Sequence, residues 1–261
     1  RLGQDAAGRE KLRDAADVMV PLAPRSPERL AAEVRQPIAD REARLRFWDG
    51  KLPEADKPRH LAVSINRALG DLLLGYPQSL IFGEDVSTKG GVYHVTADLK
   101  RRAGVARVFD TLLDEQTILG LALGAGHVGC LPIPEIQYLA YYHNAEDQVR
   151  SEAASLSFFS NGQYRNPCVI RIAGYAYQKG FGGHFHNDNS IAALRDVPGV
   201  VIASPSRGDD AVRLLRTCMA AAAVDGAVCF FLEPIALYMT RDLYDDHDGL
   251  WSWAYPAPGP E

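Results

Sequence analysis

The chain has 261 residues and a formal net charge of -5 at pH 7, and 47% of its residues are hydrophobic. This length and hydrophobic fraction suffice for one sizeable globular domain with extensions. The acidic balance includes no basic stripe that could neutralise phosphates, which argues against a nucleic-acid partner. No apolar stretch approaches the roughly 20 residues that a membrane-spanning helix needs, so we expect no membrane insertion. The four cysteines lack the paired spacing of a zinc site.

The first 58 residues predict a helical extension rather than a domain core. Helical patterns cover residues 9–20 and 26–47, with no strand between them. Ser26 followed by Pro27 is typical of a helix start, because a hydroxyl can cap the first turn and proline is tolerated there. We therefore predict an extension over 1–58, a domain over 59–244, and a linker or tail over 245–261.

Beyond residue 58, helical spacing alternates with short apolar segments. We predict strands at 79–83, 106–109, 133–136, 168–173, 200–203 and 227–232, and helices at 61–73, 115–128, 145–159 and 209–222. The strands are apolar on both faces, which is typical of a sheet that is covered on both sides. The predicted fold class is therefore α/β, with a mostly parallel sheet and helices on both faces.

Open parallel sheets bind ligands at the carboxyl ends of their strands, and polar or glycine-rich stretches follow several of the predicted strands. One of them contains Glu115, the first residue of a predicted helix, directly after Asp114. These acids could simply complement the helix dipole. Alternatively, Glu115 could be a carboxyl group held in a cleft with a shifted pKa.

The glycine-rich run 174–189 does not match a phosphate-binding loop. It contains His184 and His186, which would point to the same side of an extended chain. Such a pair can bind a metal ion, but no third ligand is evident. We therefore expect a contact with substrate or a role in proton transfer, and we assign no metal ligand in this chain.

Together these stretches resemble the β half of the decarboxylating component of 2-oxoacid dehydrogenase complexes, the pyruvate and branched-chain enzymes. The resemblance runs from about residue 60 to residue 238. It is carried by the segments 82–86, 108–115, 135–137, 182–186 and 231–234, which read FGEDV, VFDTLLDE, EIQ, GGHFH and FLEP. The resemblance implies the pyrimidine-binding domain of a thiamine diphosphate enzyme.

The resemblance also implies roles for individual residues. Glu115 would protonate a ring nitrogen of the cofactor's aminopyrimidine, so that the neighbouring imino nitrogen can deprotonate the thiazolium ring. Asp114 is a second candidate for cofactor contact, and Tyr141 would stack on the pyrimidine ring, although it could equally be an ordinary core aromatic. His186 would face the substrate and the incoming lipoyl group as a proton donor.

The sequence contains no Gly-Asp-Gly followed by a distant Asn, the motif that holds Mg²⁺ and diphosphate in this superfamily. The resemblance therefore implies an α-type half that binds these groups, either as a separate chain or fused ahead of this one. It also implies a lipoyl-bearing acyltransferase as a partner and a hetero- or homo-oligomer such as a heterotetramer. We expect the bacterial cytoplasm as the location, with the mitochondrial matrix as the alternative.

Two other functions remain open from the sequence. A transketolase-like ketol transfer would use the same domain, because fold does not settle function. The chain could also be a non-catalytic scaffold or regulatory subunit, although the presence of Glu115, Tyr141 and His186 argues against it.

Overall fold

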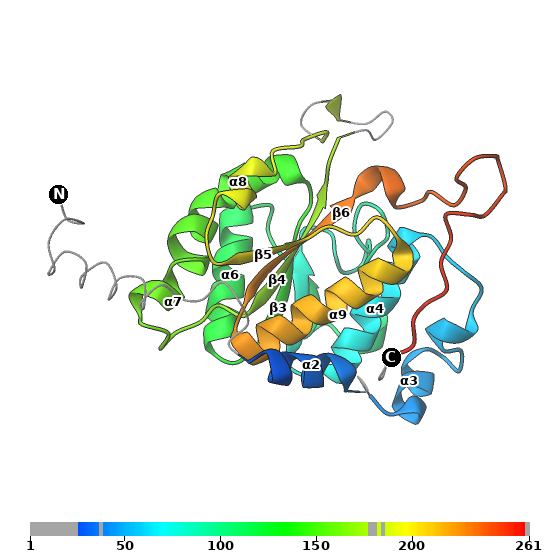
Figure 1. Cartoon of the computed structure of the whole chain (residues 1–261), viewed down its shortest axis with the longest axis horizontal. Helices are drawn as coiled ribbons and strands as arrows, with labels where there is room; N and C mark the ends of the chain where they lie inside the picture. Colours follow the sequence, from blue (N-terminus) through cyan, green and yellow to red (C-terminus); the bar gives the residue numbers. More distant parts are fainter. Residues whose placement is uncertain (1–25, 37–38, 177–181, 184–185, 259–261) are drawn as a thin grey trace, which may run out of the picture.

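The computed structural model describes residues 26–36, 39–176, 182–183 and 186–258. Within these ranges a six-stranded, fully parallel sheet forms the centre of the molecule (Figure 1), in the order β2-β1-β3-β4-β6-β5. The strands are β1 (Ser79–Gly83), β2 (Val108–Asp110), β3 (Leu131–Ile136), β4 (Cys168–Gly174), β5 (Val200–Ala203) and β6 (Val228–Pro234). The predicted α/β fold with a parallel sheet is confirmed.

Strand β3 begins two residues earlier than the sequence predicts and includes Pro132 and Pro134. Proline cannot donate a backbone hydrogen bond, so it is rarely found inside a central strand. Both prolines lie opposite β1, whereas pairing with β4 begins only at Glu135, opposite Arg171. The proline-containing part of β3 is therefore paired with a strand on one side only, which makes the two prolines compatible with the sheet.

Helices cover both faces of the sheet (Figure 1), because alternate residues of each strand point to opposite sides. In β6, Cys229 and Phe231 join the core beneath α4 and α9, whereas Phe230 and Leu232 join the core beneath α6 and α8. The main helices are α4 (Leu61–Gly75), α5 (Leu99–Ala103), α6 (Glu115–His127), α7 (Leu156–Phe159), α8 (Ala192–Arg195) and α9 (Gly208–Asp225). Short 3₁₀ segments are η1 (Pro53–Ala55), η2 (Leu139–Ala145) and η5 (Ile235–Leu237). Among the described residues, no helix is both long and apolar enough to cross a bilayer.

The helix predicted over 145–159 is present, but it changes type along its length. The 3₁₀ segment η2 ends at Ala145, the π-helical segment η3 (Gln148–Ala153) follows, and α7 comes last. Ala145, Val149 and Ala153 are buried at intervals of four residues. In an α-helix each such interval overshoots one turn by about 40°, so a strict four-residue repeat drifts off one face. Val149 and Ala153 are both buried within the wider turn of the π-helical segment.

The helix predicted over 26–47 is divided into α2 (Pro27–Arg35) and α3 (Arg41–Phe47). Gln36 ends α2 with an extended backbone, as expected for a residue that precedes proline. The Asp40 carboxylate then accepts a hydrogen bond from the Ala43 amide at 2.8 Å and caps α3. The helix predicted over 9–20 lies outside the described residues.

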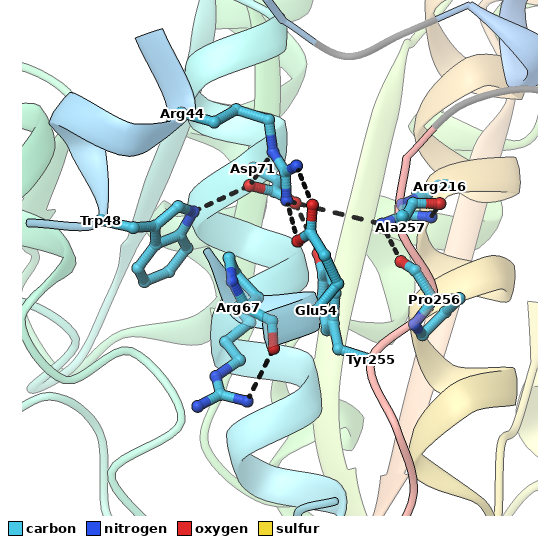
Figure 2. Close-up of polar contacts among 10 residues, drawn as sticks. Arg44, Trp48, Glu54, Arg67, Asp71, Arg216, Tyr255, Pro256 and Ala257 are labelled. Atoms are coloured by element: carbon cyan, nitrogen blue, oxygen red, sulfur yellow. Dashed lines mark hydrogen bonds and ion pairs between the residues drawn. The ribbon is translucent and has the colours of Figure 1, made fainter. Parts of the chain in front are cut away.

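The extension is attached to the domain by a buried carboxylate (Figure 2). Asp71 on α4 is fully buried, and Arg44 of α3 donates to it from Nε at 3.2 Å and from Nη2 at 2.9 Å. Trp48 Nε1 donates to the same carboxylate at 2.9 Å, and the hydroxyl of Tyr255, near the C-terminal end, donates at 2.7 Å. Arg44 also donates to Glu54 at 2.6 Å. Segments from both ends of the described chain thus converge on α4.

Candidate active site

Most of the residues that the sequence indicates for function lie along the carboxyl edge of the sheet. Glu84 follows β1, Glu115 begins α6 after β2, and Tyr141 follows β3. His186 comes after β4. This arrangement follows from the fold, because parallel strands all end at the same edge.

Glu115 is a buried carboxyl group at the first position of α6, with 7% of its surface exposed. The side-chain amide of Asn144 donates to its Oε2 at 3.0 Å. Asp114, one residue earlier, is exposed, and its carboxylate accepts a hydrogen bond from the Thr117 hydroxyl. Asp114 therefore behaves as a surface partner of the helix terminus, whereas Glu115 is directed into the protein.

An aromatic cluster surrounds His186 at the same edge of the sheet. The Tyr141 hydroxyl lies 3.0 Å from Nε2 of His186, and the ring centroid of Tyr138 is 4.2 Å from that of the imidazole. Gly182 lies against the other side of the ring, since a Cβ atom there would stand 1.5 Å from Nδ1. Tyr141 is half-buried and contacts the core on both sides of the sheet, so its ring is partly a core residue and partly accessible. His184 lies outside the described residues.

Glu84 brings a second carboxyl group to this edge. Its Oε2 atom is buried and has no hydrogen-bond partner among the described residues. Burial raises the pKa of Glu84, and the nearby charges of Asp85 and Glu115 raise it further. One oxygen of the half-buried Glu84 side chain is therefore a buried acceptor near Glu115 that has no partner among the described residues.

A buried ionic network lies beneath the same edge and was not expected from the sequence. Arg171 in β4 donates to Glu135 at 2.7 Å and, from Nε and Nη2, to Glu233 at 2.6 and 2.9 Å. The Tyr238 hydroxyl donates to Glu233 at 2.6 Å. Burial raises the pKa of Glu135, and the Arg171 charge opposes this shift. One signal for this network was present in the sequence, because Arg171 is the single charged residue within the apolar strand 168–173. If that strand is central, a buried arginine requires acidic partners.

The sequence analysis also missed Asn144. It lies in η2, which the sequence assigned to no element before residue 145. In a 3₁₀ segment residues three apart lie above one another, so Asn144 shares a side with Tyr141. Its spacing from Tyr141 could have indicated a role, but only if the 3₁₀ conformation had been known.

The residues at this edge suit a protonatable aromatic ring that carries an amino group. Glu115 offers an oxygen to a ring nitrogen, Glu84 offers a buried acceptor, and Tyr141 offers a ring face. Among the described residues there is no group of three or more His, Cys, Asp or Glu side chains that could hold a metal ion. The site described here is thus suited to an organic ring.

The comparison with known proteins shows which protein family this chain belongs to. Residues 59–239 match the family model of the transketolase pyrimidine-binding domain, and the chain belongs to this family. Over 183 residues it is 36% identical to the 3-methyl-2-oxobutanoate dehydrogenase subunit beta of Mycobacterium tuberculosis, covering 70% of this chain and 51% of the relative. It is also 35% identical to the pyruvate dehydrogenase E1 component subunit beta of Bacillus subtilis, covering 67% of this chain and 52% of the relative. The predicted resemblance to the β half of 2-oxoacid dehydrogenases is confirmed.

Two further facts limit what these relatives imply. The chain spans about half the length of the curated relatives it matches. A solved structure described as "Split gene transketolase, inactive beta4 tetramer" superposes with a TM-score of 0.50 at 18% identity, covering 67% of this chain and 50% of that chain. At that identity, the solved structure supports the fold alone.

Proposed function

We propose that this chain provides the pyrimidine-binding half-site of a thiamine diphosphate-dependent 2-oxoacid dehydrogenase. The observation that carries the proposal is the buried carboxyl of Glu115 at the start of α6, which is bonded to Asn144 of η2, the 3₁₀ segment that also carries Tyr141. The relatives named for 3-methyl-2-oxobutanoate and pyruvate dehydrogenases support a 2-oxo acid as the substrate class. The substrate would be decarboxylated and its acyl group transferred to a lipoyl domain.

In this proposal Glu115, Tyr141 and His186, at the carboxyl edge of the sheet, have distinct roles in the reaction. The bound cofactor supplies the electron sink that decarboxylation of a 2-oxo acid requires. Glu115 shares a proton with the ring nitrogen of the pyrimidine, and Tyr141 holds the ring by stacking. His186, oriented by the Tyr141 hydroxyl, exchanges a proton with the substrate or with the lipoyl group. Diphosphate and Mg²⁺ belong to the α-type half, and this chain contributes no assigned ligand to them.

The partner half is supported by an exposed apolar surface next to the site. Leu112 and Leu113 directly precede α6 and Glu115, and they are 80% and 66% exposed. Exposed apolar groups of this size are typical of surfaces that contact another protein. We assign this surface to an α-type half or a second copy in an oligomer, with a lipoyl-bearing acyltransferase as the partner that receives the acyl group.

The test uses the complete enzyme that contains this chain. Thiamine diphosphate with Mg²⁺ is titrated by calorimetry into the wild type and the Glu115→Ala variant, and decarboxylation of pyruvate and branched 2-oxo acids is then measured. We expect Glu115→Ala to lower turnover by about 10²- to 10⁴-fold, the range typical for loss of a general acid or base. The matched control is Glu152→Ala, which removes an exposed carboxyl group and should leave turnover unchanged.

Turnover that survives Glu115→Ala would refute the proposed mechanism. Ketol transfer from a ketose phosphate, without decarboxylation of 2-oxo acids, would favour the transketolase-like alternative. A complete enzyme that neither binds the cofactor nor turns over any of these substrates would indicate a scaffold.

A further inference from the structure

We propose that Asn144 is a positioning residue for Glu115, which fixes the carboxyl group so that one defined oxygen meets the pyrimidine nitrogen. This inference rests on the proposed function, because it concerns how Glu115 contacts the cofactor. It adds a residue to the site that neither the sequence motifs nor the family resemblance supplied.

The hydrogen bond from Asn144 involves only one of the two carboxylate oxygens of Glu115 among the described residues. Asn144 Nδ2 donates to Oε2 at 3.0 Å, and the described residues contain no second donor to this carboxylate. Oε1 is therefore the oxygen left for a ligand. An amide is a suitable donor for this purpose, because it fixes the rotamer of the carboxylate without adding a charge.

The local backbone explains why Asn144 can reach Glu115. Segment η2 is a 3₁₀ turn, in which side chains three residues apart eclipse one another. Tyr141 and Asn144 are three apart, and η2 packs against α6. One rigid turn thus places both the stacking ring and the donor to Glu115, so that the ring face and the carboxyl group keep a fixed relation.

The carboxyl group of Glu84 gives a second reason why Glu115 needs the hydrogen bond from Asn144. Glu84 lies near enough to Glu115 for the two carboxyl groups to repel each other when both are ionised. Without a donor, Glu115 could rotate away from Glu84 and from the ring nitrogen. The Asn144 amide opposes that rotation through a charge-assisted hydrogen bond, which is stronger than one between neutral groups.

The decisive experiment pairs a protein variant with a cofactor variant. The binding of two ligands to the complete enzyme is measured by calorimetry in the presence of Mg²⁺. One ligand is thiamine diphosphate, and the other is an analogue in which carbon replaces the pyrimidine nitrogen that faces Glu115. Asn144→Ala removes the donor, and Asn144→Asp keeps the shape but places a carboxylate against Glu115. Gln163→Ala is the matched control, because it removes an exposed amide elsewhere on the surface.

We expect Asn144→Ala to weaken binding of thiamine diphosphate by about fivefold to tenfold, the upper part of the range for one typical intramolecular hydrogen bond. Asn144→Asp should weaken it at least as much. The same changes should alter binding of the analogue by less than about twofold, because the analogue has no nitrogen for Glu115 to contact. Gln163→Ala should leave both affinities unchanged.

Equal weakening of both ligands by Asn144→Ala would overturn the inference, since it would indicate a purely structural role. Unchanged binding of thiamine diphosphate in both Asn144 variants would overturn it as well, while leaving the proposed function intact. A wild-type enzyme that does not bind thiamine diphosphate at all would overturn the proposed function and this inference together. The three results are distinct, so the failure of one proposal can be told from the failure of the other.

Discussion

The buried carboxylate of Asp71 should decide whether the N-terminal extension and the C-terminal segment stay attached to the domain. Asp71→Ala removes the acceptor of Arg44, Trp48 and Tyr255 at once. Among the described residues, Arg44 then keeps its contact with Glu54, which is partly exposed. The substitution therefore leaves buried donors unpaired in addition to deleting an ion pair.

The expected loss in the free energy of unfolding follows from the burial of the ion pair between Arg44 and Asp71. The side chains of Arg44 and Asp71 are 5% and 0% exposed. Breaking a buried ion pair by removing one partner typically costs about 3–5 kcal/mol when the remaining charge is left unpaired. Arg44 keeps Glu54 as a partner, which lowers this cost, whereas Trp48 and Tyr255 lose their acceptor as well, which adds to it. The three donors share one acceptor, so their individual contributions should not be added. We therefore expect Asp71→Ala to lower the free energy of unfolding by about 3–5 kcal/mol.

Two measurements check this magnitude and its location. Denaturant unfolding of the wild type and the variant gives the change in stability. Limited trypsin digestion reports whether the basic sites in 41–51 become accessible, as release of α3 requires. The control Glu42→Ala breaks an ion pair with Arg46 whose side chains are 83% and 66% exposed, so little change is expected. A loss below about 1 kcal/mol in Asp71→Ala, with digestion at the wild-type rate, would contradict the reasoning.

Two further outcomes test the site edge and the pH response. A Cβ atom at Gly83 would stand 2.7 Å from the carbonyl oxygen of Glu135, so Gly83→Ala should separate β1 from β3 and lower the free energy of unfolding by about 1–3 kcal/mol. The control Gly124→Ala meets no atom within 4 Å and should be neutral or slightly stabilising in unfolding experiments; equal destabilisation of both would show that the close contact is not the cause. Burial lowers the pKa of His60, although its Nδ1 contact with the Tyr238 carbonyl at 2.7 Å opposes the shift. The unfolded chain therefore binds a proton at a higher pH than the folded one, so this contribution to stability is complete above about pH 6.5 and declines as the pH falls below it. Unfolding measured from about pH 7.5 to about pH 5.5 should show a shallower decline in His60→Gln, and identical slopes would count against the assignment.

Local patterns in the sequence determined the class of fold and the strongest catalytic candidate. Apolar segments of strand length alternate with helical spacing because each element must bury a face of defined period, and this information is local. The same logic placed Glu115 at a helix start after a strand, the position that parallel sheets use for ligands. The family resemblance then gave Glu115 a chemical role that its position alone did not provide.

Only the tertiary structure decided the features that depend on contacts between distant residues. Pro132 and Pro134 fit within β3 because β4 pairs with it only beyond them, a fact of strand register rather than of composition. The bond from Asn144 to Glu115 joins residues 29 apart and needs a 3₁₀ turn that no periodicity indicated. The contact of Tyr255 with Asp71 joins residues 184 apart. Periodicity describes how one segment meets a core, whereas the pairing of particular polar groups depends on how whole elements pack, and packing is fixed only when the chain has folded.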